Sequence, residues 1–248
     1  MMKKKKIAEI LIVIIFTGFV FFLGWTQFKV GAGKCGILIS KTSGVNTDPV
    51  LPGKFTWHWE CLIPTNAELR LFSLKPYIET KSIHGTLPSA DVYSAVFNIH
   101  SDFSYRFDFS ISGKAVPADI AELVKNGIVS DSDSLNSYLD SAYSALANKA
   151  AVFILDKITE NPSFRPESLK SDDILNGIAA AEDWPYIIFT DFSIISSKLP
   201  DRTLYNSARD TYIAELKQQR ERASARKEKV NELLQQFPEL QNLFSGRQ

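Results

Sequence analysis

Four lysines, Lys3 to Lys6, lead directly into an apolar run that extends from Ile7 to Trp25. Glu9 is the only acidic residue near this run. Roughly 20 apolar residues are needed to cross the hydrocarbon core of a bilayer, and the bulky stretch from Phe21 to Phe28 is unlike the small residues of a signal-peptide cleavage site. The pattern therefore predicts an uncleaved transmembrane anchor over residues 7–28 after a cytoplasmic basic segment, 1–6. The anchor residues would be Ile10, Phe16, Phe22 and Trp25.

The lysine cluster favours a cytoplasmic N-terminus, although Lys29, Lys34 and Lys41 reduce the charge asymmetry. We therefore expect a single-pass protein of the bacterial inner membrane with its body on the extracytoplasmic side. In that oxidising compartment Cys35 and Cys61 could form a disulfide. Two half-buried free thiols fit the sequence equally well.

The next region, up to about Lys114, has the pattern of β-strands. We expect strands over residues 34–41, 54–60 and 68–78, with a turn at Pro49–Gly53. The clearest signal is an alternation of apolar and polar residues that puts one strand face in a core and the other in water. Its apolar positions are Phe103, Tyr105, Phe107, Phe109 and Ile111.

After Pro117 the apolar period becomes helical. We expect a helix over residues 117–126 that Gly127 closes, and a longer one that Ser132 or Asp133 caps and Pro162 ends. Ser171 would cap a third helix. The strand predicted over residues 186–196 carries apolar residues on both faces, which indicates burial between layers. Helices and strands together predict an α+β domain.

A long helix without an internal proline or glycine is predicted over residues 200–237, followed by a tail, 238–248. Its middle is rich in charge, and a lone helix of this composition is marginal in water, so we expect neighbouring helices. Apolar residues along it form an imperfect heptad that could support a coiled coil. These positions are Ile213, Leu216, Ala223, Val230, Leu234 and Phe237.

Composition and motifs give no indication of an enzyme. Hydrophobic residues make up 45% and charged residues 23%, and the formal net charge is zero, which does not favour nucleic acid as a partner. His58, Glu60 and Cys61 lack the paired spacing and four donors of a structural zinc site. Neither a nucleophile elbow nor a nucleotide-binding glycine motif is present. We therefore predict no catalytic residue, metal or cofactor.

Several stretches in this order resemble the SPFH or band 7 family, which includes stomatins, prohibitins, flotillins and related bacterial inner-membrane proteins. The matching stretches are Gly36–Ile39, Val50–His58, Leu62–Pro64, Asp191–Ile194 and Leu199–Asp201. The resemblance implies an SPFH-type mixed sheet and helix domain over residues 31–199. The chain differs from the family around Ser82–Ser89, has less Ala/Glu repetition in the long helix, and ends soon after that helix.

The resemblance implies a membrane-anchored oligomeric scaffold that organises the local membrane or regulates membrane proteins such as a protease. Its partners would be the lipid bilayer and further copies of itself or a related SPFH protein. The alternative is a monomeric anchored binding module with a helical partner-binding arm. Phe55, Trp57 and Trp59 would either fill the core or contact lipid headgroups.

Overall fold

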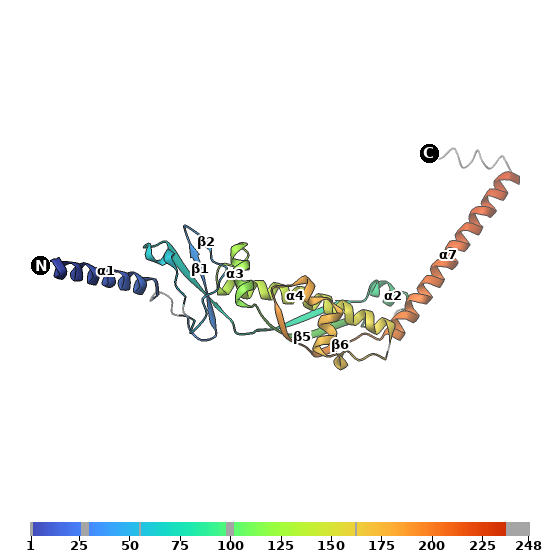
Figure 1. Ribbon diagram of the computed structural model, residues 1–248. Coiled ribbons are helices and arrows are strands. Elements are labelled where there is room, and N and C mark those ends of the chain that lie inside the picture. The colour runs from blue at the N-terminus through green and yellow to red at the C-terminus, as the bar shows by residue number, and fades with distance from the viewer. Residues whose placement is uncertain (1, 26–29, 55, 98–101, 162, 237–248) are drawn as a thin grey trace. The chain divides into compact units, whose positions relative to one another are not determined.

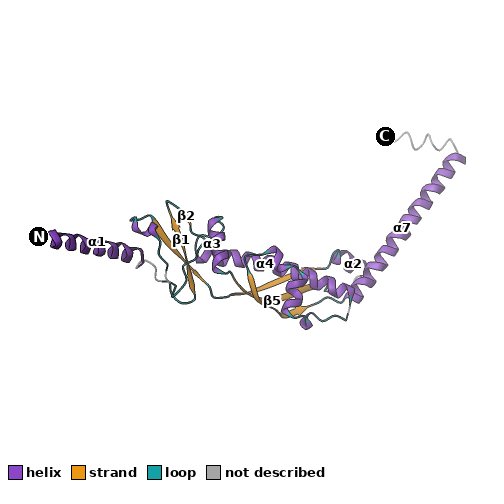
Figure 2. Cartoon of the chain, viewed as in Figure 1, coloured by secondary structure: helices purple, strands orange, loops and turns teal. Residues whose placement is uncertain are grey.

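The computed structural model describes residues 2–25, 30–54, 56–97, 102–161 and 163–236 (Figure 1). In these ranges the chain is a mixed α/β protein with seven α-helices and two three-stranded antiparallel sheets (Figure 2). The helices are α1 (Met2–Trp25), α2 (Ala90–Phe97), α3 (Pro117–Lys125), α4 (Ser132–Glu160), α5 (Ser171–Gly177), α6 (Ala180–Asp183) and α7 (Arg202–Gln236), with short turns η1 (Trp59–Leu62) and η2 (Pro166–Ser168). The strands are β1 (Lys34–Ser40), β2 (Gly44–Val45), β3 (Ala67–Ser73), β4 (Tyr77–Thr86), β5 (Ser104–Lys114) and β6 (Ile188–Lys198).

Contacts within the chain divide it into two compact units. The first comprises Met1–Ile83 and Phe107–Ser197, and the second comprises His84–Arg106 and Lys198–Gln248. Each unit is therefore made of two separate stretches of sequence.

The N-terminal helix α1 overturns the predicted anchor. Its described side chains run from Lys5 to Phe22, and Lys5, Lys6 and Glu9 occupy its first turns. The uncharged part of α1 that remains, from Ile10 to Trp25, is shorter than the roughly 20 residues that a crossing requires. Among the described residues, no helix combines the length and apolar composition needed to cross a membrane. The transmembrane helix in the expected fold class, the single-pass localisation and the membrane assignment built on them are therefore wrong.

The first sheet has the strand order β2–β1–β3. Strand β1 pairs antiparallel with β3 along its whole length, from Lys34 opposite Ser73 to Ser40 opposite Ala67. A Cβ atom on Gly36 would lie 2.7 Å from Cδ1 of Leu69, so glycine allows the close approach of these two strands. The sheet buries an apolar set that comprises Cys35, Ile37, Leu38 and Phe72.

Two strand predictions in this region are wrong. Residues 54–60 do not form a strand: the described part is irregular until η1 begins at Trp59. The strand expected over residues 68–78 is two strands, β3 and β4, which belong to different sheets. Pro76 lies between them, and proline cannot donate a ladder hydrogen bond.

The second sheet has the strand order β4–β5–β6, and α4 contacts it through Tyr143. Phe107, Phe109 and Ile111 of β5 are fully buried, as the alternation predicts. Tyr143 of α4 meets all three strands. Its hydroxyl donates to the Tyr77 carbonyl of β4 at 3.0 Å and lies 2.8 Å from where a Gly113 Cβ would stand on β5, while its ring lies 6.1 Å from that of Phe189 on β6.

The polar positions of β5 hold the three strands together. Ser82 of β4 donates to Asp108 Oδ1 at 2.5 Å, and Ser196 of β6 donates to Oδ2 of the same carboxylate at 2.6 Å. Ser112 and Thr190 form a further hydroxyl pair across β5 and β6 at 2.8 Å. One carboxylate thus connects the central strand to both neighbours.

Both cysteines are buried free thiols, so Cys35 and Cys61 do not form a disulfide. Burial raises the pKa of the Cys35 thiol to about 11, against a smaller opposing effect of its backbone hydrogen bond. Burial and the nearby charge of Glu60 also raise the pKa of Cys61. Both thiols are therefore neutral at physiological pH.

Candidate functional site

The long helix α7 is the candidate assembly surface that the sequence indicates, and only its beginning is packed. In the second unit, Tyr205 and Ala208 of α7 are its buried residues. The Tyr205 hydroxyl donates to the Pro88 carbonyl at 2.6 Å, and its ring meets those of Tyr93 and Phe103 edge-on, each at 5.5 Å. This small aromatic cluster holds the first turns of α7 against α2.

Beyond Tyr212, whose ring lies 5.6 Å from that of Tyr93, the helix has no buried residue between 213 and 236. Ile213 is 54% exposed and Val230 is 51% exposed. Leu216 and Leu234 are partly exposed, and Ala223 is exposed. The predicted position Phe237 lies outside the described residues. We refer to residues 213–236 as the exposed part of α7.

The exposed part of α7 contains six basic and four acidic side chains. Within this described span, no side-chain ion pair links one turn to the next. Helical ion pairs at four-residue spacing each stabilise an isolated helix by about 0.2–0.5 kcal/mol. The exposed part of α7 therefore gains stability neither from packing nor from internal ion pairs.

The predicted membrane-interface residues lie at the protein surface. Trp57 is 40% exposed and Trp59 is 48% exposed. Neither belongs to a strand, and Phe55 lies outside the described residues. The predicted anchor residues Ile10, Phe16 and Phe22 are 59%, 66% and 55% exposed on α1, whereas the side chain of Trp25 is outside the described set.

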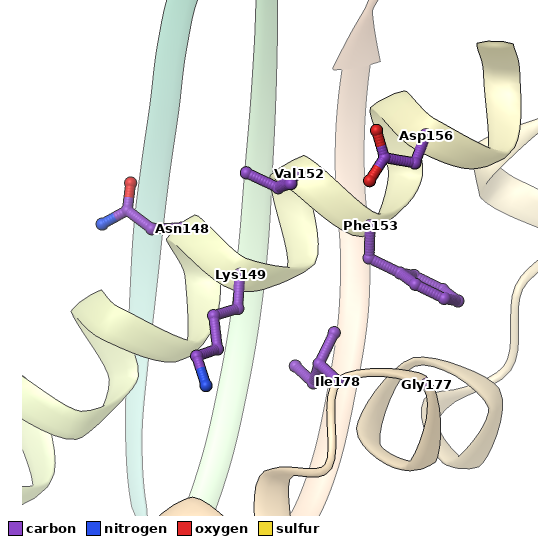
Figure 3. A pocket seen from close by; sticks show the side chains of 7 residues that line it. All are labelled: Asn148, Lys149, Val152, Phe153, Asp156, Gly177 and Ile178. Atoms are coloured by element: carbon purple, nitrogen blue, oxygen red, sulfur yellow. The ribbon is translucent and has the colours of Figure 1, made fainter.

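An open groove that the sequence did not indicate lies between α4 and the end of α5, with a volume of about 440 Å³ (Figure 3). Phe153 projects from α4 towards Gly177, where a Cβ atom would stand 2.6 Å from the ring. Lys149 forms an ion pair with Asp183, and its ammonium lies 5.5 Å from the centre of the Trp184 ring. Because this lysine already has two partners inside the chain, its charge is not available to a ligand in the groove.

A second pocket lies beside the turn that joins β1 to β2, with a volume of about 240 Å³. We call it the Glu60 pocket. Hydroxyl, amide and carboxylate groups dominate its lining. The lining residues include Leu38, Ser40, Ser43, Asn46, Thr47 and Glu60. From its sequence neighbours, Glu60 is only a potential metal ligand, and no local pattern reveals that a loop 14 to 20 residues earlier in the chain lies beside it.

Metal binding finds no support in the arrangement of the described residues. They contain no group of three His, Cys, Asp or Glu side chains that could hold an ion. His58 instead lies 3.3 Å from the amide nitrogen of Asn46 through its Nδ1 atom. The structure thus places His58 and Glu60 around the same loop without assembling a set of metal ligands.

Comparison with known proteins identifies a distant relative but no matching family model. No model of a protein family matches the chain. An uncharacterized protein of Treponema pallidum (strain Nichols) is 25% identical over 196 residues, which cover 77% of this chain. The match spans 66% of that relative's length, slightly less than two thirds.

Proposed function

We propose that this protein is an oligomeric scaffold whose copies associate through the exposed part of α7. The observation that supports the proposal is the contrast within this helix: it is packed up to Tyr212 and unburied from Ile213 to Gln236. Helices gain most of their stability in proteins from the packing of one face. A helix of this length without such packing requires a neighbour.

The spacing of apolar residues suggests what that neighbour is. Leu216, Ala223 and Val230 recur every seven residues, which is the period of a coiled-coil seam. Leu233, three residues after Val230, belongs to the second row of such a seam. In a two-stranded coiled coil, the helix of each copy would cover the Leu216 row on the helix of the other copy. Lateral association of copies is also the arrangement that the SPFH resemblance implies.

A partner-binding arm is the second candidate. Gln219 and Arg226 occupy the second row of the same seam, where a self-associating coiled coil prefers apolar residues. An acidic residue on a different protein could pair with Arg226 there. In that case α7 would bind another chain while the protein itself stayed monomeric.

The mass of the full-length protein in solution distinguishes these functions. Light scattering coupled to size-exclusion chromatography should give a multiple of the 27.8 kDa chain mass. The double substitution Leu216→Glu with Val230→Glu should shift the protein to the mass of a single chain, because it would bury four carboxylates in every dimeric seam. A wild-type protein that stays a single chain at about 100 μM, a concentration at which contacts with a micromolar Kd form, would contradict the scaffold.

The matched control is Gln218→Glu with Asn231→Glu. It adds the same two charges to α7 but on the side of the helix away from the Leu216 row. The control should retain the wild-type mass. If both double variants dissociate the assembly equally, association depends on the net charge of α7 and not on the seam.

A further inference from the structure

The Glu60 pocket combines a buried carboxylate with an otherwise uncharged polar lining. Glu60 is 9% exposed and is the only acidic residue that lines the pocket. Its carboxylate has no ion-pair or hydrogen-bond partner anywhere in the described ranges. A buried carboxylate is stable as an anion only when other groups compensate its lost hydration. No lysine or arginine is among the described residues that line the pocket, so its lining supplies no positive charge to this carboxylate.

The walls of the pocket are fixed by hydrogen bonds that do not involve this carboxylate. The buried Asn66 amide donates to Thr42 Oγ1 at 3.1 Å and to the Glu60 carbonyl at 3.2 Å, which links the β1–β2 turn to η1. Within the turn, Ser43 N–H donates to Ser40 Oγ at 2.9 Å. These bonds leave the Glu60 side chain available while they hold the turn above it.

The opposite wall is equally well ordered. The backbone N–H of Asn46 donates to the Leu38 carbonyl at 2.8 Å, and the Asn46 side-chain oxygen accepts from the N–H of Asp48, also at 2.8 Å. The loop that carries Asn46 and Thr47 is thus fastened to β1. A ligand would meet a formed pocket and would not need to order the loop.

We propose that the Glu60 pocket binds a small molecule that carries a protonated primary amine. The ammonium group would donate a charge-assisted hydrogen bond to the Glu60 carboxylate. Such a bond is stronger than a hydrogen bond between neutral groups. The remaining hydrogens of the ammonium group would meet hydroxyl and amide oxygens of the lining, which Ser40, Ser43 and Asn46 supply.

Size and donor chemistry exclude other ligand classes. A single carboxylate does not supply the six to eight oxygens that calcium takes, with several carboxylates among them. An anion would meet Glu60 with the wrong sign. At about 30 Å³ per water molecule, 240 Å³ holds roughly eight waters, which suits a short amine and is below the usual size of a cofactor site.

The test is titration of the full-length protein with ethanolamine, followed by isothermal calorimetry and ligand-observed NMR. Ethanolamine should bind with a Kd of about 1 mM or tighter, whereas acetate should not bind. Tetramethylammonium, which has charge but no N–H donor, should bind at least about tenfold more weakly. A wild-type protein that binds no ethanolamine, or that binds tetramethylammonium equally well, overturns the proposal.

Three variants localise the binding. Glu60→Gln keeps the shape of the side chain but removes its charge, and it should weaken ethanolamine binding at least about tenfold. Ser43→Leu at the exposed turn should block the pocket without changing charge. Asp48→Asn removes a nearby exposed charge that does not line the pocket, and it should bind like the wild type. The proposal is overturned if Glu60→Gln binds ethanolamine as tightly as the wild type, or if Asp48→Asn weakens ethanolamine binding as much as Glu60→Gln does.

Discussion

Helices α4 and α7 are both long, but they are stabilised in different ways. Helix α4 has 29 residues, ten of which are buried, and α7 has 35 residues, two of which are buried. The buried set of α4 repeats at helical spacing from Leu135 to Ile158, so one face remains in the core over its length. On α7 none of the apolar residues from Ile213 to Leu234 is buried.

The difference teaches that a continuous helical pattern does not show where a helix obtains its stability. For α4 the partner is the sheet of the same chain, because Tyr143 meets β4, β5 and β6 together. Its N-terminus is also closed by a capping box in which Asp131 and Ser134 satisfy each other's backbone N–H groups. The exposed part of α7 has no such packing against the described residues, and the partner that we propose for it is a second copy of the chain.

The largest contrast is expected for leucine truncation in the two helices. Leu146→Ala in α4 removes a fully buried side chain and should lower the free energy of unfolding by about 2–5 kcal/mol. Leu216→Ala in α7 should lower it by less than about 1 kcal/mol in the dissociated chain, since little area is lost and alanine favours the helix. Urea unfolding at one low protein concentration measures both effects.

Unfolding of the two variants at several protein concentrations separates packing within the chain from association between chains. If copies associate through α7, the effect of Leu216→Ala should grow as protein concentration rises, whereas the effect of Leu146→Ala should not. Equal destabilisation by the two variants in the dissociated chain would contradict the distinction between a packed and an unpacked helix.

An alkaline titration tests how well the packed first unit, in contrast to the exposed part of α7, excludes water from the buried thiol of Cys35. Because its folded pKa is about 11 and the unfolded value is 9.0, the unfolded thiol ionises first. The contribution of Cys35 is fully present below about pH 9 and is lost as pH rises towards 11, so the free energy of unfolding should fall in that window. Cys35→Ala should fall less steeply over the same window, and urea unfolding at about pH 8 and about pH 10.5 compares the two slopes.

Other groups titrate in the same range, so the difference between the two proteins is the measured quantity. Burial also raises the pKa of the Tyr143 hydroxyl, which both proteins retain. Parallel pH curves for the wild type and Cys35→Ala would show that the thiol is not desolvated in the folded state.

The smallest contrast concerns the two N-terminal caps. Asp131 accepts the Ser134 N–H at 2.8 Å at the start of α4, and Asp201 accepts the Leu204 N–H at 3.0 Å at the start of α7. Asp201→Ala should open the first turn of α7 at a cost of about 1 kcal/mol, visible as faster amide exchange there. Asp131→Ala should instead lower the urea midpoint of the whole first unit slightly, because α4 does not unfold apart from its sheet.

Acid provides an independent check of the Asp131 cap. The hydrogen bond from the Ser134 N–H lowers the pKa of the Asp131 carboxyl in the folded protein. The stability that the Asp131 carboxylate contributes is therefore present above the unfolded pKa of 3.8 and is lost as pH falls through the lower folded pKa. Asp131→Asn keeps the accepting oxygen and should restore the midpoint at neutral pH. If Asp131→Asn and Asp131→Ala behave alike, the cap does not contribute to stability.

Local sequence patterns predicted much of the fold. Strand β1, strand β5 with its buried Phe107 and Phe109, helix α3 and the long helix α7 all lie within a few residues of the expected bounds. Each of these elements has a strong period or a clear breaker such as Gly127, which adopts a positive φ of 71° after α3. Such signals depend on neighbours along the chain and are readable without the fold.

Other local signals were redirected by contacts with distant residues. Ser171 is expected to cap a helix, but it is the first helical residue of α5, and its hydroxyl accepts the Phe192 N–H from β6 at 2.9 Å. The cap of α4 is Asp131, one residue before the expected pair Ser132 and Asp133. The hydroxyl of Ser132 donates instead to the Leu71 carbonyl of β3 at 3.0 Å.

The sequence by itself determined the order and type of most elements and the long charged helix at the end, because backbone periodicity and turn chemistry are local properties. Only the tertiary structure decided that the strands divide into two sheets, that Cys35 and Cys61 are buried free thiols, and that Glu60 lines a polar pocket. These features depend on residues far apart in the chain that meet when the core packs. No pattern within one segment encodes such a meeting.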